Sequence, residues 1–451
     1  MKSYLEGVNK RKKVDIILLN TPILDYKKKK VIDYLATAPL GLGYLATIAK
    51  EKGHNVGLLD AEAKKVPIEI IIKAVNGAKP KILGINLISA NYALTKKIIK
   101  GINPEIFIIA GGPHATLRAK DVLKQNKNIN VVLRGEGEEA WAQFLNKFPN
   151  YENINGFTYR KDKSIVCIGQ QSHIKNLDSL PFIDRNFFSN DPYYKDNLKE
   201  VSISTARGCP GCCSFCSVPV INGRRVRARS FDNIIQEIKS LEKKYGIDSV
   251  HFTDDNFTFD QKWITNLCKA LVKEKLNIKW RALARVNDLD EDLLLLMKKA
   301  GCYMLAIGVE SGSERTLKII NKTINRGHLL NVLDVCKKQK IKTKGFFTIG
   351  YPHETKKEIE DTITFACELP LDEACFTAVR AFPETPLYNS LLEKGFTKKQ
   401  LDSYHQFYDK DCIDYKLTKY HVANKVSISN FSLQFLDKCI KKANKLFCNT
   451  R

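Results

Sequence analysis

The sequence predicts an α/β protein with two successive parallel-sheet domains and a helical C-terminal region. Short apolar, β-rich runs alternate with amphipathic helical stretches over residues 1–150, and the same alternation returns over residues 200–392. Residues 151–199 combine short strand-like pieces with turns, and residues 393–451 are polar and mainly helical. With 451 residues, 44% hydrophobic and 27% charged, the chain is long enough for two or three domains with separate cores. We therefore expect two folded domains, a connector between them and a helical tail.

The first domain contains five predicted strands, separated by stretches that suit helices, such as Gly41–Lys52 and Tyr92–Ile102. The strands are predicted at Val14–Asn20, Asn55–Asp60, Ile82–Asn86, Ile106–Ala110 and Val131–Arg134. This order is typical of a Rossmann-like or flavodoxin-like doubly wound parallel sheet, in which ligands bind beyond the carboxyl ends of the strands.

Polar residues and glycines stand at these strand ends. Paired glycines let backbone amides approach a ligand closely, although tight turns use such pairs too. The strand-end residues that we interpret as a ligand-binding edge are Asn20, Ser89, Gly111, Gly112, His114, Gly135 and Gly137.

The second domain contains six predicted strands with helical stretches between them. They are predicted at Val201–Thr205, Ser249–Phe252, Trp280–Ala284, Leu305–Val309, Gly345–Ile349 and Cys375–Val379. Six such units predict a partial (β/α)6 TIM-like barrel, with functional residues at the C-terminal ends of the strands.

The loop after the first barrel strand carries Cys209, Cys213 and Cys216 with the spacing CxxxCxxC. Three thiolates at this spacing can hold one cubane iron–sulfur cluster and leave its fourth iron without a protein ligand. A zinc site usually draws its ligands from two separated pairs, and the 13 scattered cysteines suit a reducing compartment better than disulfides. Cys212 leaves a second ligand set open, namely Cys209, Cys212 and Cys216.

The cysteine loop resembles that of the radical S-adenosylmethionine (radical SAM) enzymes. The runs Pro39–Tyr44, Gly111–His114 and Arg134–Gly137 are similar to the cobalamin-binding domain of one large class of these enzymes. The resemblance implies a [4Fe-4S] cluster on Cys209, Cys213 and Cys216, with SAM and cobalamin as further cofactors. It also implies that the strand-end residues of the first domain bind cobalamin. A DxHxxG motif is absent, so no histidine is expected on the lower face of cobalamin, and His114 is expected to contact the cofactor tail or a turn.

The resemblance further implies a SAM site at the strand ends of the barrel. Asp254 or Asp255 is expected to accept hydrogen bonds from the SAM ammonium group, and Arg285 is expected to bind its carboxylate. Helix capping is the alternative for Asp255. The remaining residues carried over are Glu310 and Ser311 for the ribose and carboxylate, and Ile349 and Gly350 beside the adenine.

A turn at Pro383–Tyr388 is similar to the PGTxLY turn of the family, but Glu384 replaces the glycine. This departure puts the backbone conformation of the turn in question.

The resemblance implies a methyltransferase that cleaves SAM reductively and acts on an unactivated carbon, or on phosphorus, of an unidentified small-molecule or peptide substrate. A flavodoxin-like or ferredoxin-like electron donor is implied as partner. The alternatives are a rearrangement or oxidative cyclisation without methyl transfer, a tRNA methylthiotransferase, and a non-enzymatic corrinoid or iron sensor. The methylthiotransferases carry three more cluster cysteines in their N-terminal domain, whereas this chain has no cysteine before Cys167.

The net charge of +24 arises mostly from lysines, which suit a solvated surface. Binding of nucleic acid is not expected, because no recognition motif of that kind is visible. No apolar run approaches the ~18 residues of a membrane span, so we expect no integral membrane contact and a cytoplasmic location.

Overall fold

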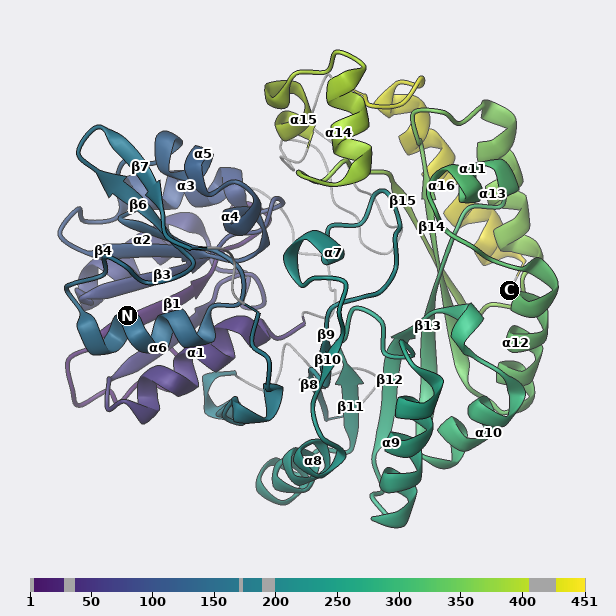
Figure 1. Ribbon diagram of the computed structural model, residues 1–451, viewed down its shortest axis with the longest axis horizontal. Helices are drawn as coiled ribbons and strands as arrows, with labels where there is room; N and C mark the ends of the chain where they lie inside the picture. The colour runs from purple at the N-terminus through teal and green to yellow at the C-terminus, as the bar shows by residue number, and fades with distance from the viewer. Residues whose placement is uncertain (1–3, 28–36, 170–172, 189–198, 405–426, 451) are drawn as a thin grey trace. The chain divides into compact units, whose positions relative to one another are not determined.

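The computed structural model describes residues 4–27, 37–169, 173–188, 199–404 and 427–450. The chain divides into two compact units, Met1–Lys195 and Asp196–Arg451 (Figure 1). None of the helices in these described ranges combines the length and the apolar character that a membrane span needs.

The first unit is built on a seven-stranded sheet with the order β2-β1-β3-β4-β5-β6-β7. Its strands are β1 (Ile16–Asn20), β2 (Val56–Asp60), β3 (Ile82–Asn86), β4 (Phe107–Gly111), β5 (Val131–Leu133), β6 (Phe157–Lys161) and β7 (Ser164–Cys167). Strands β1 to β5 are parallel and have the flavodoxin-like order. Strand β2 is added on one side of β1, and β3 to β5 are added on the other side, so the strand order reverses between β1 and β3. The predicted fold class of this domain is therefore confirmed.

Helices cover both faces of this sheet (Figure 1). They are α1 (Leu40–Glu51), α2 (Ile68–Ala78), α3 (Tyr92–Gly101), α4 (Pro113–Leu117), α5 (Ala119–Gln125) and α6 (Glu138–Lys147). Helices α1 and α6 pack against each other over a core that includes Leu18, Ala46 and Phe144. Helices α2 and α3 pack together on the opposite face.

The predicted connector, residues 151–199, differs from the structure at its N-terminal end. Strands β6 and β7 lie inside that range, yet they extend the first sheet as an antiparallel hairpin next to β5. The parallel strands are buried along almost their whole length, whereas burial decreases across the hairpin: Phe157 and Tyr159 of β6 belong to the core, and β7, at the edge, contacts it through the partly buried Val166. This part of the range therefore belongs to the first unit.

The second unit contains six parallel strands in the order β15-β14-β13-β12-β11-β8. They are β8 (Glu200–Ile203), β11 (Ser249–Phe252), β12 (Lys279–Ala284), β13 (Cys302–Glu310), β14 (Lys342–Ile349) and β15 (Glu373–Ala378). Because sequential strands are neighbours and helices connect them, the sheet is the predicted partial (β/α)6 barrel.

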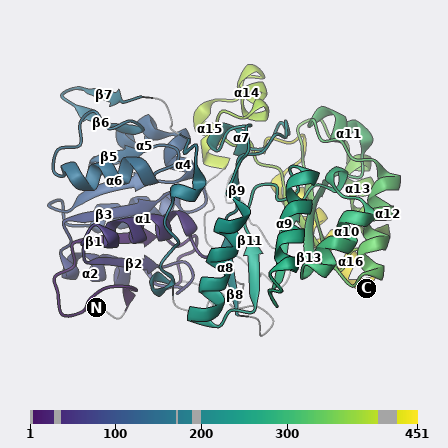
Figure 2. The ribbon, with the colours of Figure 1, turned by 60° about the horizontal axis from the view of Figure 1, so that its bottom comes forward.

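Helices α8 (Phe231–Tyr245), α9 (Gln261–Lys273), α10 (Glu291–Lys299) and α12 (Arg326–Lys338) pack in sequence along the outer side of the strands (Figure 2). The other helices are α7 (Val218–Ile221), α11 (Glu314–Ile319), α13 (Lys356–Glu368), α14 (Pro386–Glu393), α15 (Lys398–Tyr404) and α16 (Leu433–Asn449). The predicted helical tail includes α16, whose Leu436, Ile440 and Phe447 complete the barrel core beside β15.

Each helix from α8 to α13 begins with a capping side chain that accepts a hydrogen bond from a backbone amide of the first turn. The caps are Ser230, Asp260, Asp290, Ser313, Asn325 and Thr355. An N-cap fixes the point at which a loop becomes a helix. The caps therefore help to fix the loops that follow the barrel strands, where the predicted site residues lie.

Candidate active site

The cysteine loop leaves strand β8 through a two-stranded ribbon. Strand β9 (Ala206–Arg207) pairs in antiparallel fashion with β10 (Arg227–Ala228), which closes the loop at its base. Inside the ribbon, the Cys209 amide donates to the Gly223 carbonyl at 3.2 Å. Gly208 has φ +100°, and a Cβ there would lie 2.7 Å from the Arg225 carbonyl oxygen, so the loop requires glycine at this position.

Cys209, Cys213 and Cys216 are close enough to influence one another electrostatically. Burial raises the pKa of the Cys213 thiol, and it raises the pKa of Cys216 to about 11; the Cys209 charge adds to both effects. Cys212 is exposed, with its Sγ 3.9 Å from the Pro210 carbonyl oxygen. The structure thus groups the three cysteines of the CxxxCxxC register and turns Cys212 toward solvent.

The donor set fits a multi-iron cluster. Among the described residues, no three His, Cys, Asp or Glu side chains are spaced to surround a single metal ion. A cubane presents a separate iron to each thiolate, so it accepts three cysteines that do not converge on one point. Burial raises the pKa of Cys213, and the positive charges of Lys322 and Arg285 act in the opposite direction. These two charges therefore favour the thiolate, which is the form that binds iron.

Asp254 anchors the exit of strand β8. Its carboxylate, 4% exposed, accepts hydrogen bonds from the Thr205 amide at 2.7 Å, the Ala206 amide at 3.0 Å and the Thr205 hydroxyl. Burial raises the pKa of Asp254 to about 6, although these bonds act in the opposite direction. Because both oxygens are engaged by the protein, the geometry does not favour Asp254 as the residue that contacts the SAM ammonium group.

Asp255 faces the cysteine loop itself. Its carboxylate accepts hydrogen bonds from Asn222 Nδ2 at 2.8 Å and from the Gly208 amide, and its charge acts on the Cys216 thiol. Burial raises its pKa, and the nearby Arg207 opposes that effect. Of the two adjacent carboxylates, Asp255 is the one directed toward the cysteines.

Glu310 ends strand β13 in a strained conformation. Its φ of +67° lies in the left-handed region, and the pairing of β13 with β14 shifts by one residue between Gly308 and Glu310. The carboxylate accepts a hydrogen bond from Thr348 Oγ1 at 3.0 Å and lies 3.9 Å from Lys322 Nζ. Burial raises its pKa, while the Lys322 charge lowers it. Lys322 is a site residue that the sequence did not indicate.

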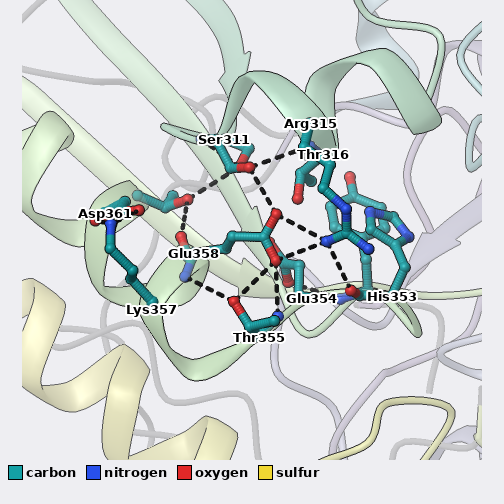
Figure 3. Close-up of polar contacts among 12 residues, drawn as sticks. Ser311, Arg315, Thr316, His353, Glu354, Thr355, Lys357, Glu358 and Asp361 are labelled. Atoms are coloured by element: carbon teal, nitrogen blue, oxygen red, sulfur yellow. Dashed lines mark hydrogen bonds and ion pairs between the residues drawn. The ribbon is translucent and has the colours of Figure 1, made fainter.

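The loops after β13 and β14 are joined by the network shown in Figure 3. Arg315 Nη1 donates to both oxygens of Glu358, at 3.0 and 2.9 Å, and to the His353 carbonyl at 3.1 Å. Ser313 Oγ donates to Glu358 at 2.9 Å, and Glu358 also receives the Thr355 amide in a capping box. These bonds hold the pKa of Glu358 at about 2 against its partial burial, so the carboxylate stays ionised.

Ser311 and Gly350 belong to the same pair of loops. Ser311 is fully buried, and its hydroxyl bonds to Thr362 Oγ1 at 3.0 Å, so this side chain positions the loop. Ile349 is also fully buried, and the Gly350 amide donates to Glu354 at 2.6 Å. The Glu310–Ser311 segment and the Ile349–Gly350 segment are therefore fixed relative to one another through α13.

We expect Glu358→Gln to lower the free energy of unfolding by about 1–3 kcal/mol, because the amide loses the charge and presents a donor to the Thr355 amide. Urea denaturation of Glu358→Gln, with Glu360→Gln as the control, measures this change in the free energy of unfolding. Glu360 is exposed on the same helix, and its variant should remain within about 0.5 kcal/mol of the parent. Equal stability of the two variants would contradict the role of the network.

The cysteine loop is also held from its other side. The Ser214 amide donates to the Ile320 carbonyl, and the Ser214 carbonyl accepts the Leu387 amide, each at 2.9 Å. The Phe215 ring lies edge-on to Tyr351, 5.9 Å between centroids, at the edge of an apolar cluster formed by α11, α14 and the loop after β14. The first turn of α14 therefore supports the cysteine loop directly.

Glu384, in the turn Pro383–Tyr388, has a left-handed backbone conformation with φ +64°, which is the region that glycine adopts most readily. This left-handed conformation costs a side chain roughly 1–2 kcal/mol, whereas glycine loses roughly 0.5–1 kcal/mol in chain entropy. We expect Glu384→Gly to raise the free energy of unfolding by about 0.5–1 kcal/mol. Glu384→Ala keeps the strained backbone, so its free energy of unfolding in urea denaturation should not exceed that of the parent. If both variants were more stable than the parent, the glutamate side chain, rather than the backbone conformation, would be the unfavourable feature.

The ligand edge of the first unit is a row of polar groups at the ends of β2, β1 and β3. Asn20 Nδ2 donates to Asp60 at 2.9 Å, and Asn86 Nδ2 donates to Asn20 at 3.1 Å. Gly112 has φ +99°, and a Cβ there would lie 2.4 Å from Asn86 Oδ1, so only glycine fits against this row. The row stands where the strand order reverses, which is the ligand position of doubly wound sheets.

The other predicted residues of this edge divide into two groups. His114 Nδ1 lies 3.1 Å from Ser89 Oγ, and its ring packs on Tyr92 at 4.3 Å between centroids, so His114 is held as part of a turn. Gly135 donates its amide to Thr116 Oγ1 at 2.9 Å, and Gly137 precedes α6. Asn20 ends β1 and Gly111 ends β4, Ser89 follows β3, and Gly112 and His114 follow β4. Gly135 and Gly137 follow β5, farther from the reversal point.

Comparison with known proteins identifies both units. The radical SAM superfamily model matches residues 203–366, and the B12 binding domain model matches residues 34–145. The uncharacterized methyltransferase PH0819 of Pyrococcus horikoshii is 34% identical over 382 residues, which cover 83% of each chain. The chain therefore belongs to the radical SAM superfamily. More narrowly, it belongs to the cobalamin-dependent radical SAM methyltransferases, a family that also includes cyclases.

More distant relatives show the range of the family. The cytidylyl-2-hydroxyethylphosphonate methyltransferase of Streptomyces wedmorensis is 26% identical, with 84% of this chain and 82% of the relative covered. The anaerobic magnesium-protoporphyrin IX monomethyl ester cyclase of Rubrivivax gelatinosus is 29% identical, with 79% and 66% covered. The structure of the methyltransferase TsrM from Kitasatospora setae has the same fold, with a TM-score of 0.70, 19% identity and coverage of 84% and 78%. The cofactors of this family are a [4Fe-4S] cluster, SAM and cobalamin.

Proposed function

We propose that this protein is a methyltransferase that uses radical SAM chemistry to methylate an unactivated carbon, or phosphorus, of a small-molecule or peptide substrate. The observation that supports this most directly is the group formed by Cys213, Lys322 and Glu310 at the C-terminal end of the barrel, in a chain that also carries a B12 binding domain. When bound, the cluster supplies an electron to SAM, and cobalamin supplies a methyl group.

The protein's part is to bind and orient these groups. Cys209, Cys213 and Cys216 would hold the cluster, and the ribbon β9–β10 and Asp254 fix the loop that carries them. Asp255 would accept hydrogen bonds from the SAM ammonium group, since it faces the cysteines. Glu310 would accept hydrogen bonds from the ribose hydroxyls, with Ile349 and Gly350 beside the adenine.

In the first unit, the polar row and the glycine pair Gly111-Gly112 would bind cobalamin at the reversal point of the sheet. Ser89 and His114 would contact its tail, while Gly135 and Gly137, which lack side chains, would let the backbone approach it closely. The partner that delivers the electron would be a flavodoxin-like or ferredoxin-like protein, because the cluster needs a reductant at the low end of the potential range.

Anaerobic reconstitution of the full chain tests this function. We expect about four iron and four sulfide per chain, a corrinoid absorption spectrum after incubation with cobalamin, and formation of 5′-deoxyadenosine with a strong reductant. With a substrate in hand, the product mass should increase by one CH₂ unit. A chain that is reconstituted with the cluster but forms no 5′-deoxyadenosine would contradict the proposal.

A second function, cyclisation without methyl transfer, is supported by the similarity to the cyclase of Rubrivivax gelatinosus over 79% of this chain. The same product analysis separates the two functions, because a cyclisation leaves no added CH₂ unit.

A further inference from the structure

The surface of the cysteine loop is basic. Residues 201–231 include five arginines and neither aspartate nor glutamate. Three of the arginines interact within the fold: Arg207 with Asp255, Arg227 with the Asn222 carbonyl, and Arg229 with Glu237. The other two, Arg224 and Arg225, are exposed, and their side chains form no ion pair or hydrogen bond with the part of the chain that the structure describes. Two positive charges are therefore directed to solvent.

The segment that carries these two charges lies against a predicted cluster ligand. The Cys209 amide donates a hydrogen bond to the Gly223 carbonyl at 3.2 Å. A Cβ on Gly208 would lie 2.7 Å from the Arg225 carbonyl oxygen, so the two backbones are in close contact. One hydrogen bond thus separates the residue before Arg224 from a residue that would hold an iron. The arginine pair marks a part of the protein surface that is next to the base of the cysteine loop.

Helix α7 (Val218–Ile221) adds an apolar part to this surface. Its sequence is Val-Pro-Val-Ile, and none of these residues is buried. Figures 1 and 2 show α7 beyond the end of the ribbon β9–β10, and only Asn222 and Gly223 separate it from the arginine pair along the chain. Apolar side chains next to arginine are typical of protein interfaces. We call α7 together with Arg224 and Arg225 the basic cluster-loop surface.

We propose that the basic cluster-loop surface binds an acidic one-electron carrier protein, which reduces the cluster from this position. This role rests on the proposed function, because reductive cleavage of SAM consumes one electron. In the transfer, the flavin or iron–sulfur centre of the carrier is oxidised by one electron and the cluster is reduced by one electron, while no atom moves between the proteins. The surface is suited to this step because it lies next to a cluster ligand.

Charge complementarity decides the kind of partner. Arginine binds carboxylates through two parallel hydrogen bonds, and a surface with arginines and no acidic residue attracts a negatively charged protein. Electron-transfer complexes are weak and commonly bury less than about 1,200 Å². A short apolar helix and two arginines are therefore enough for such a contact. Attraction between opposite charges also speeds association more than it strengthens binding, which suits a carrier that must leave after each transfer.

The double variant Arg224→Glu/Arg225→Glu tests the surface. The contact with Gly208 uses the Arg225 backbone, which the substitution keeps. Isothermal titration calorimetry measures the binding of an oxidised flavodoxin and of an oxidised ferredoxin to the reconstituted full chain. Stopped-flow spectrophotometry with the reduced carriers measures the reduction of the cluster. At about 50 mM salt we expect the variant to bind the carrier at least about tenfold more weakly than the parent and to be reduced at least about tenfold more slowly; about 500 mM salt should diminish both differences.

Two controls isolate the docking step. Lys337→Glu/Lys338→Glu makes the same change in net charge at the C-terminal end of α12, which is followed by the start of β14 at the other end of the barrel strands. This variant should differ from the parent by less than about threefold in both measurements. Photoreduced 5-deazariboflavin, a small uncharged reductant, should reduce all three proteins equally. The electron paramagnetic resonance (EPR) spectrum of the reduced cluster shows whether the cluster itself is intact in each protein.

The outcomes distinguish this role from the proposed function. The role of the surface would be overturned if neither carrier bound the parent, if the arginine variant bound the carrier as the parent does, or if it reacted equally slowly with the carrier and with 5-deazariboflavin. In the last case, the arginines would act on the cluster or its cofactors instead of on a partner. In all three cases the proposed function stands, provided that the parent forms 5′-deoxyadenosine with 5-deazariboflavin. A parent that fails in that reaction would overturn the proposed function, and the role of the surface with it.

Discussion

Cys213→Ala is expected to give a folded protein that cannot hold an intact [4Fe-4S] cluster and forms no 5′-deoxyadenosine, whereas Cys212→Ala is expected to retain both properties. The reason is geometric. Cys213 is half-buried and acts electrostatically on Cys216, while Cys212 is exposed with its sulfur near the Pro210 carbonyl. A cubane bound by three cysteines loses one corner when a single ligand is removed.

The measurement is iron and sulfide content after anaerobic reconstitution, together with the EPR spectrum of the reduced protein. Far-ultraviolet circular dichroism of both variants shows whether the fold survives, and Cys209→Ala provides a second ligand variant for comparison. If Cys212→Ala lost the cluster and Cys213→Ala kept it, the ligands would be Cys209, Cys212 and Cys216, and the loop would have to turn when iron binds.

The alternation of strands and helices was enough to predict both sheets. Four of the five strands predicted for the first sheet agree with the structure within one residue at each end, and β11 was predicted with its observed bounds. The strand-like pieces of the 151–199 range were predicted, but their pairing as the hairpin β6–β7 at the edge of the first sheet was not, because such short strands have the same local pattern as a connector. Only pairing with β5, which is a long-range contact, distinguishes the two.

Individual roles in the site were harder to predict, for reasons that differ from residue to residue. Adjacent side chains at a strand end point in different directions, so the sequence could not say which of Asp254 and Asp255 faces the cysteines. Lys322 follows Glu310 by a helix and a turn, and nothing in the local pattern brings its ammonium group back over Gly308. Glu384 differs from these cases, because a left-handed backbone at a glutamate is unusual and the residue type alone did not indicate it.

Asp254→Ala is expected to lower the free energy of unfolding by about 3–5 kcal/mol, the largest stability effect that the site predicts. Truncation removes the acceptor for the Thr205 and Ala206 amides and for the Thr205 hydroxyl. Thr205 is fully buried and Ala206 is 4% exposed, so water does not readily replace the lost carboxylate. Since these two residues lead directly into the ribbon that closes the cluster loop, cluster content should fall together with stability.

Urea denaturation of the apoprotein measures the stability effect without interference from the cluster, and Asp255→Ala is the matched control. Asp255 is less buried and accepts from Asn222 and the Gly208 amide, so its loss should cost about 1–2 kcal/mol. The two variants should therefore separate stability from binding: Asp254→Ala mainly unfolds the loop, and Asp255→Ala mainly weakens SAM binding. A carboxylate that anchors a buried strand exit cannot be removed without loss of stability. If Asp254→Ala were as stable as the parent and bound SAM more weakly, Asp254 would therefore not be an anchor, and the contact with the SAM ammonium group would be assigned to Asp254 instead of Asp255.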